Sequence, residues 1–355
     1  MEKKAIIAMS GGVDSSVAAF IMKEKGFHII GVTMKLYDNE DIGIDTEKTC
    51  CSLSDIEDAR SVCYKLGSLY YVFNFKAEFK YKIIDDFINT YENGGTPNPC
   101  IRCNRYLKFE KLMHRMFELQ YDYVVTGHYA RVEKRGDRYI LKKAVDLTKD
   151  QSYVLYNLTQ EQLKHIRFPL GEMNKTEVRK IAEENGFINA NKRDSQDICF
   201  VPNGKYAEFI EEFTGKTYPE GDFVDTNGNV LGRHKGIIRY TIGQRKGLGL
   251  ALPCPMYVKE KDLNSNRVVL CVNDELFSTT LYADDFNWLS IEQPKNPIHC
   301  KARIRYNQKE QPATAEVMPD GSVKVVFEQP QRAICKGQAV VLYDEDVVLG
   351  GGTIL

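Results

Sequence analysis

Apolar residues in the first half of the chain follow two alternating patterns. Short apolar runs, typical of buried strands, lie at residues 5–9, 27–37, 68–75 and 121–133, the last running into a loop. Apolar positions at helical spacing lie at residues 16–26, 54–67, 79–94 and 106–120. Strands that alternate with helices predict a parallel sheet with helices on both faces, which binds ligands at the carboxyl ends of its strands. We expect Gly26 to end the first helix and Ser54 to be the N-cap of the second.

The pattern changes at about Gly204, where Gly, Pro and Asn become frequent. A short helix is expected at 206–216, and alternating segments then predict antiparallel strands and a small barrel or sandwich. These segments are residues 267–273, 301–306, 313–318, 322–327 and 339–355. At roughly 150 residues per domain, 355 residues suggest two or three domains. We expect an α/β domain at 1–205, a small central β-rich domain at 206–277 and a C-terminal β-barrel at 278–355.

Composition narrows the classes of function. Apolar residues make up 43% and charged residues 27%, as in an ordinary globular protein. The net charge of −1 gives no global signal for nucleic acid, so such a site would be a local patch. The apolar run 5–9 is shorter than the core of a signal peptide, and no run approaches a membrane span. We therefore expect a cytoplasmic protein without a membrane partner, whose ten cysteines are reduced and serve catalysis, redox chemistry or metal binding.

Residues 10–16 read SGGVDSS and lie between the first predicted strand and helix. Adjacent glycines let the backbone approach a phosphate, and the helix start turns free amides toward it. The stretch has neither the spacing nor the lysine of the G-x-x-x-x-G-K-[ST] loop. Hydroxyls of Ser10, Ser15 and Ser16, with Asp14 able to help hold Mg²⁺, suit a pyrophosphate unit better than phosphoryl transfer. The alternative is a Gly-Gly turn with a Ser/Asp helix cap.

Two cysteine segments point to chemistry. Cys100 and Cys103 lie in a Pro-rich turn before a helix, beside Arg102 and Arg105, so we expect their pKa to be lowered. Cys199 lies in the polar segment 193–202. A zinc half-site is the alternative for C-x-x-C, but zinc needs four ligands and the sequence has no second such pair.

The other cysteines carry weaker signals. Cys63 and Cys271 lie on apolar faces and are expected to be buried packing residues. Cys50 and Cys51 adjoin a helix start and are weak candidates for function. Cys254, Cys300 and Cys335 have no partner signature.

These segments resemble a known family. SGGVDSS is similar to the loop of the N-type ATP pyrophosphatases, which include GMP synthetase, argininosuccinate synthetase and tRNA-modifying enzymes. With the cysteine segments, the chain resembles the tRNA-specific 2-thiouridylases, the MnmA/TrmU family, from its first strand to its last residues. The motifs that carry this resemblance are CCS–DIEDA, GGTPNPC–CN–KF, TGHYAR, KDQSYVLY, RDSQDICF, GRHKG, YTIGQRKGLG and KGQAVVLYDEDVVLGGG.

The resemblance implies a fold and a reaction. Residues 1–205 would form a Rossmann-like PP-loop ATPase domain of the adenine nucleotide alpha hydrolase type, and the C-terminal barrel would contact tRNA. ATP with Mg²⁺ would adenylate the carbon-2 oxygen of the wobble uridine of tRNA, with Lys, Glu and Gln acceptors expected. Cys199 would carry a persulfide supplied by a sulfur-relay protein and a cysteine desulfurase. Cys103 would be the partner nucleophile and would end in a transient disulfide with Cys199.

The resemblance also assigns binding residues. ATP would be bound by Ala8, Met9, Ser10, Gly11, Gly12, Val13, Asp14, Ser15, Ser16, Met34 and Gly127. The target base and tRNA would contact Asn98, Pro99, Cys100, His128, Lys149, Asp150, Gln151, Arg305, Tyr306 and Gln338. Ordinary packing is the alternative for Met34 and His128. The basic turn at 239–249 suits phosphates or is a solvated hairpin.

Cys100 departs from the family, because many members carry aspartate there. Cys100, Cys103 and Cys199 would supply three thiolates for a four-iron cluster with one open iron, which is the rival route for sulfur. Two other classes are weaker. Another adenylating synthetase would need an ammonia source, and a non-catalytic nucleotide sensor would leave the cysteine segments unexplained.

Overall fold

The computed structural model describes residues 2–38, 53–192, 198–201 and 204–355. Its N-terminal part contains a five-stranded sheet in the order β3-β2-β1-β4-β7, and every pairing in it is parallel. The strands are β1 (Lys4–Ala8), β2 (His28–Lys35), β3 (Leu69–Asn74), β4 (Tyr123–Val125) and β7 (Ile166–Arg167). The predicted parallel sheet is therefore confirmed.

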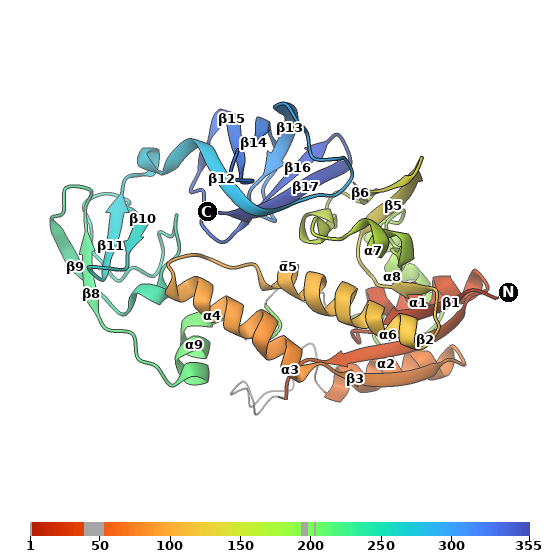
Figure 1. The fold of residues 1–355 in the computed structure, drawn as a ribbon. Coiled ribbons are helices and arrows are strands. Elements are labelled where there is room, and N and C mark those ends of the chain that lie inside the picture. Colours follow the sequence, from red (N-terminus) through yellow and green to blue (C-terminus); the bar gives the residue numbers. More distant parts are fainter. Residues whose placement is uncertain (1, 39–52, 193–197, 202–203) are drawn as a thin grey trace.

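Alternate residues of the sheet supply two cores. On β1, Ile6 packs into one cluster while Ala5 and Ile7 pack into another, as strand geometry requires. One face is covered by α1 (Val13–Glu24), α2 (Leu53–Lys65) and α8 (Lys175–Glu184). The other face receives the π-helical segment η3 (Asn104–Lys111) and α6 (Leu112–Glu118), which continue α5 (Pro99–Cys103). Figure 1 shows this continuous helix running between the sheet and the C-terminal barrel.

The remaining described helices are of three kinds. The α-helices are α3 (Lys76–Phe79), α4 (Asp85–Glu92), α7 (Gln160–His165) and α9 (Tyr206–Thr214), the π-helix is η2 (Lys80–Ile84), and the 3₁₀-helices are η4 (Ser152–Leu155), η6 (Ile237–Arg239) and η7 (Asn273–Leu276). Gly26 lies just past the end of α1 with φ +76°, as expected for a left-handed residue. Ser54 lies inside α2 because the helix already includes Leu53, so its assignment as the N-cap is wrong. The π-helical turns within the predicted helices were not expected.

The central sheet has the order β10-β11-β8-β9. Its strands are β8 (Gly221–Val224), β9 (Val230–His234), β10 (Tyr257–Asp262) and β11 (Arg267–Cys271). Strand β11 is antiparallel to β10 but parallel to β8. The prediction that residues 267–273 form a purely antiparallel strand is therefore wrong. One edge of β11 pairs with β10, its neighbour in sequence, and the other edge pairs in parallel with β8, which is far from it in sequence.

The C-terminal strands close into a barrel, since β12 pairs with both β15 and β17. The strands are β12 (Phe277–Trp288), β13 (Ile298–Arg303), β14 (Gln311–Val317), β15 (Val323–Arg332), β16 (Ala339–Asp344) and β17 (Val347–Ile354). The hairpin β5 (Ala130–Arg135) and β6 (Arg138–Lys143) extends this sheet, because Lys142 pairs with Val347. The sequence did not predict that an N-terminal hairpin joins the barrel.

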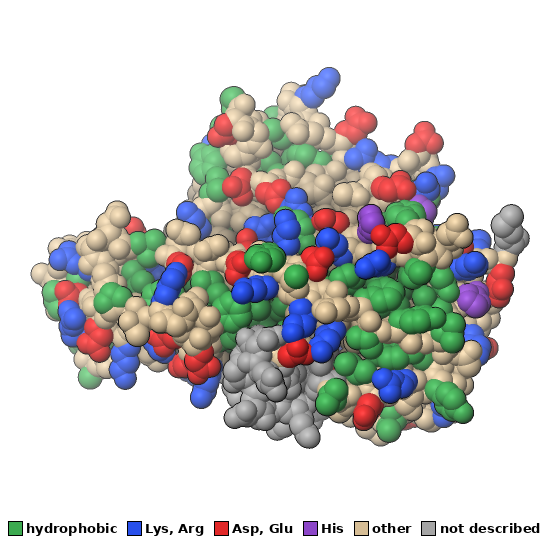
Figure 2. Space-filling model, turned by 60° about the horizontal axis from the view of Figure 1, so that its bottom comes forward, with side chains coloured by type: hydrophobic (Ala, Val, Ile, Leu, Met, Phe, Trp, Pro, Cys, Tyr) green, Lys and Arg blue, Asp and Glu red, His purple; other side chains and the backbone are tan. Residues whose placement is uncertain are grey.

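On the face shown in Figure 2, Lys and Arg side chains are interspersed with Asp and Glu, and hydrophobic side chains gather at the lower right. Mixed charges on this face agree with the net charge of −1. No helix within the described ranges is both long and apolar enough to cross a membrane.

The contact between β2 and α2 is tight enough to test. A Cβ added at Gly31 would collide with the Cys63 thiol, and Cys63 is 1% exposed. We expect Gly31→Ala to lower the free energy of unfolding by about 1–3 kcal/mol, because overpacking forces neighbours apart. Adding Cys63→Ala should recover part of this loss in urea denaturation. Strictly additive effects of the two substitutions would contradict the contact.

Candidate active site

Strand β1 leads into the SGGVDSS loop, and α1 begins at Val13 with Gly12 as its N-cap. Within the described residues no side chain caps this helix. Instead, Ser15 Oγ and Ser16 Oγ donate to the Gly12 carbonyl over 3.0 and 3.1 Å. Gly11 has φ +71°, and a Cβ there would lie 2.5 Å from the carbonyl oxygen of Asp55. A helix start without a side-chain cap, behind a close-packed glycine turn, suits an anion.

Two lysines from distant segments reach this lysine-free loop. Lys175 Nζ lies 2.7 and 2.8 Å from the two carboxylate oxygens of Asp14, which also accepts from Tyr129 Oη at 2.8 Å. Lys192 Nζ lies 2.6 Å from carboxylate oxygens of Asp55 and Asp58 and 3.3 Å from the Gly11 carbonyl. Sequence reasoning missed both lysines. The N-x-x-E capping box at Asn174 could have located Lys175 at a helix start, but not its contact with the loop.

Gly127 lies against the start of α1, where a Cβ would come within 2.8 Å of the Asp14 and Ser15 backbone. The neighbouring His128 is buried between the rings of Phe109 and Phe168, at 5.9 and 5.8 Å. Its Nδ1 is 2.7 Å from Thr126 Oγ1. Burial lowers the pKa of His128 well below its ordinary value, and the charge of Lys108 lowers it further. His128 is therefore a neutral imidazole.

Cys100 and Cys103 lie on α5, whose N-cap Asn98 accepts a hydrogen bond from Ile101 N. Cys100 is exposed, whereas Cys103 lies at the end of α5 where it continues into η3. Burial raises the pKa of the Cys103 thiol to about 11, Lys108 opposes this rise, and Cys100 adds to it. The expected lowering is therefore wrong for Cys103, because this half-buried thiol is desolvated by apolar side chains and lies at the C-terminal end of α5.

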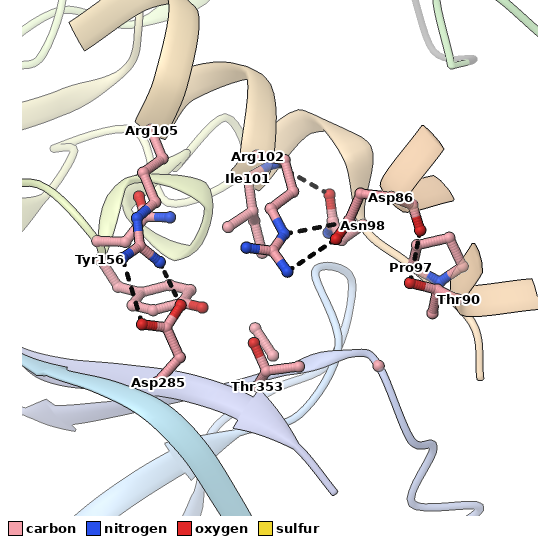
Figure 3. Close-up of a pocket in the computed structure, with 13 residues that line it drawn as sticks. Asp86, Thr90, Pro97, Asn98, Ile101, Arg102, Arg105, Tyr156, Asp285 and Thr353 are labelled. Carbon is pink, nitrogen blue, oxygen red and sulfur yellow. Dashed lines mark hydrogen bonds and ion pairs between the residues drawn. The ribbon is translucent and has the colours of Figure 1, made fainter. Parts of the chain in front are cut away.

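The two arginines beside these cysteines are held by carboxylates. Arg102 donates to Asp86 of α4 over 2.9 and 3.2 Å, and Arg105 pairs with Asp285 of β12. Both arginines line a polar cavity of about 50 Å³ between α4, α5 and the barrel (Figure 3). Their charges are partly neutralised by these pairs.

Cys199 shares an apolar environment with Cys103. Both half-buried thiols pack against one cluster that includes Phe79, Phe87 and Phe200. Tyr37 Oη donates to the Cys199 carbonyl over 2.7 Å. Phe200 stands edge-on to Phe79 and Phe87, at 5.5 and 5.1 Å. The backbone at Cys199 is thus anchored on the side of the molecule that holds Cys103.

Barrel residues reach the same region. Gln338 Nε2 donates to the carbonyls of Thr96 and Pro97, at 2.8 and 3.2 Å. Tyr306 Oη lies 3.4 Å from the Asp150 carbonyl. Burial raises the pKa of Tyr306, and the charges of Asp150 and Cys100 add to the rise. The barrel and the 96–103 segment therefore enclose one polar region around Cys100.

Known protein families match this chain along almost its whole length. Family models match residues 3–203 as a tRNA methyl transferase HUP domain, 207–272 as a tRNA methyl transferase PRC-barrel domain, and 278–354 as an aminomethyltransferase beta-barrel domain. The tRNA-specific 2-thiouridylase MnmA of Clostridioides difficile (strain 630) is 51% identical over 356 residues, covering 100% of this chain and 98% of that protein. The MnmA of Acetivibrio thermocellus is 51% identical, with 99% of each chain covered.

The chain belongs to the tRNA-specific 2-thiouridylase family. The resemblance carried by the sequence motifs is thereby confirmed. Among solved structures, a 4-thiouridine synthetase–RNA complex with bound ATP is 18% identical, with a TM-score of 0.39 over 60% of this chain and 50% of that one.

Several residues that the 2-thiouridylase motifs assign are close together. Ser10, Gly11, Gly12, Asp14, Ser15, Ser16 and Gly127 meet at the loop, while Cys100, Asp150 and Tyr306 meet below the barrel. Gln151 Oε1 accepts from Tyr129 N at 3.0 Å, which links these two regions.

Met34 packs against the clusters on both sides of its strand end. Arg305, which directly precedes Tyr306, donates to the Ala333 carbonyl at 2.7 Å.

The other cysteines are also placed. Cys63 and Cys271 are each 1% exposed, which confirms their packing role. Cys50, Cys51 and residues 193–197 lie outside the described residues. Among the described residues, no group of three or more His, Cys, Asp or Glu side chains is placed to hold a metal ion.

The raised pKa of Cys103 predicts how the rate at which its thiol is alkylated depends on pH. With a pKa near 11, its thiolate fraction should rise about tenfold per pH unit between pH 7 and 9.5 in the protein without tRNA. Iodoacetamide labelling, followed by peptide mass spectrometry, should show this slope at Cys103. The exposed Cys254 serves as an internal control for the reagent. A plateau in the Cys103 rate below pH 8.5 would show that its pKa is not raised.

Proposed function

We propose that this member of the family adenylates the carbon-2 oxygen of the wobble uridine of tRNA and then replaces it with sulfur. The observation that carries this proposal is the arrangement of two reactive regions on one scaffold. An anion-binding helix start without a Walker lysine lies against Gly127, and the thiol-bearing helix packs against the neighbouring His128 through Phe109. Activation and sulfur transfer therefore take place on adjoining segments.

The loop would hold the phosphates of ATP through the first amides of α1 and the hydroxyls of Ser10, Ser15 and Ser16. Asp14 lies within the loop and its carboxylate is paired with Lys175. It is the residue of the loop itself whose carboxylate would hold Mg²⁺, which would neutralise charge on the leaving pyrophosphate. Lys175, 11% exposed in its side chain, would then turn from Asp14 toward the phosphates and supply the cation that the loop lacks.

Sulfur transfer would use two thiols. The outer sulfur of a Cys199 persulfide attacks carbon 2, and the bond from carbon 2 to oxygen breaks, its electron pair leaving with AMP. The Cys103 thiolate next attacks the Cys199 sulfur, and the sulfur–sulfur bond to the base breaks to give 2-thiouridine. The two cysteines end as a disulfide, which a dithiol reductant must reduce. The raised pKa of Cys103 would keep it protonated, and so unreactive, until the base is bound.

The target base would lie near Asn98, Pro99 and Cys100, with Tyr306, Gln338 and the Lys149–Gln151 segment above it. A flipped base needs such a pocket between polar and aromatic groups. The tRNA species with Lys, Glu and Gln acceptors, the sulfur-relay protein and the desulfurase belong to this proposal as its expected partners.

The rival iron–sulfur route uses the same cysteines. Cys103 and Cys199 pack on one apolar cluster, while Cys100 is exposed. Among the described residues these three thiols are not grouped to hold a metal ion, which favours the two-thiol route. Cys100→Ser separates the routes, because the two-thiol route predicts full aerobic activity without iron, and the cluster route predicts its loss.

Reconstitution tests the function. The protein, with ATP, Mg²⁺, a persulfide donor and tRNA bearing a wobble uridine, should form 2-thiouridine detectable by nucleoside mass spectrometry. Cys199→Ser and Cys103→Ser should abolish the product, because each removes a sulfur atom at which the proposed reaction forms or breaks a bond. Cys254→Ser, at an exposed position away from the site, is the matched control. Product formation by either active-site variant would overturn its assigned role.

Lys175 can be tested separately. Lys175→Met should slow tRNA-dependent release of pyrophosphate by about 100-fold, the effect of removing one group that stabilises developing negative charge. Lys180→Met is the control, since Lys180 is on the same helix but exposed and paired only with Glu184 among the described residues. Equal rates in the two variants would remove Lys175 from the phosphate site.

A further inference from the structure

The thiol-bearing helix has a basic residue at every third position, namely Arg102, Arg105, Lys108 and Lys111. Three of the four are held by carboxylates: Arg102 by Asp86, Arg105 by Asp285 and Lys111 by Glu78 at 3.2 Å. Lys108 forms neither an ion pair nor a hydrogen bond with any residue in the described ranges. It is also half-buried, where an unpaired charge is unfavourable unless a ligand completes it.

Lys108 lies between the two reactive regions. It follows Cys103 by five residues within a π-helical turn, whose i to i+5 hydrogen bonding brings these positions one above the other. Its charge acts on both the Cys103 thiol and the His128 imidazole. His128 adjoins Gly127, whose Cα faces the first residues of α1 at the nucleotide loop. Lys108 therefore lies between Cys103, five residues earlier on this helix, and Phe109, which packs against His128 beside the nucleotide loop.

The proposed reaction requires one anionic group between the thiols and the nucleotide loop. In the proposed reaction, the α-phosphate of the activated base joins carbon-2 oxygen to the adenosine. The sulfur approaches carbon 2 from the side of the thiols, while the loop holds the departing pyrophosphate. The α-phosphate must therefore lie between the thiols and the loop.

Resting on the proposed function, we propose that Lys108 binds the non-bridging oxygens of this α-phosphate and is a catalytic residue for both half-reactions. In the first, the carbon-2 oxygen forms a bond to the α-phosphorus, and the bond to pyrophosphate breaks with its electron pair leaving on pyrophosphate. In the second, sulfur bonds to carbon 2, and the carbon–oxygen pair leaves with AMP. A fixed cation stabilises the negative charge that builds on the phosphate in each step.

The test compares Lys108→Met with Lys108→Arg and with Lys111→Met, a matched lysine three residues along the same helix. Single-turnover formation of 2-thiouridine at saturating ATP and tRNA should fall about 100-fold in Lys108→Met. Lys108→Arg should recover much of the rate, and Lys111→Met should match the wild type. The melting temperature of each variant shows that it is folded.

A sulfur substitution in ATP makes the test specific to the contact. Replacing one non-bridging α-oxygen by sulfur should slow the wild type and Lys111→Met more than Lys108→Met, because that variant has already lost the contact. An equal sulfur effect in all three proteins would overturn the inference. So would a higher KM for tRNA with an unchanged single-turnover rate, which would place Lys108 on the tRNA backbone. If the wild type and Lys111→Met form no 2-thiouridine, the proposed function itself fails.

Discussion

The helix that runs from Pro99 to Glu118 is fixed from two sides, and the relation between the thiols and the nucleotide loop depends on this. Phe109 packs into the core beneath the sheet, and Asn104 Nδ2 donates to the buried Val154 carbonyl at 2.9 Å. From the other side, Arg105 pairs with Asp285 of the barrel. A helix held by both domains cannot shift toward one without breaking contacts with the other. The barrel therefore helps to set where Cys100 and Cys103 lie.

Charge pairing decides which groups remain available for a substrate. Around the loop, Asp14 is neutralised by Lys175, and around the thiols the arginines are neutralised by acidic residues. Ion pairs stabilise such partly buried charges, and Lys108, which has no ion-pair partner among the described residues, is left to bind an anion. The same reasoning explains the protonated state of Cys103, because its apolar surroundings disfavour a thiolate more than the nearby lysine favours it.

The sequence predicted the parallel sheet, the barrel and the loop, because local periodicity and glycine spacing encode them. It did not predict that Lys175 reaches the loop, because that contact joins residues 161 positions apart. It also misjudged the pKa of Cys103, because the flanking arginines suggest an activated thiol, whereas the apolar side chains that desolvate this thiol come from distant segments. The π-helical turns were also missed, because apolar spacing alone does not distinguish them from an α-helix.

The central claim is that the loop activates the base oxygen so that sulfur can replace it. The most direct test uses tRNA carrying ¹⁸O on carbon 2 of the wobble uridine and measures the AMP released during one turnover by mass spectrometry. The account predicts that the AMP phosphate carries one ¹⁸O, because the carbon–oxygen bond breaks and the oxygen leaves with the nucleotide. Unlabelled AMP formed together with 2-thiouridine would contradict it.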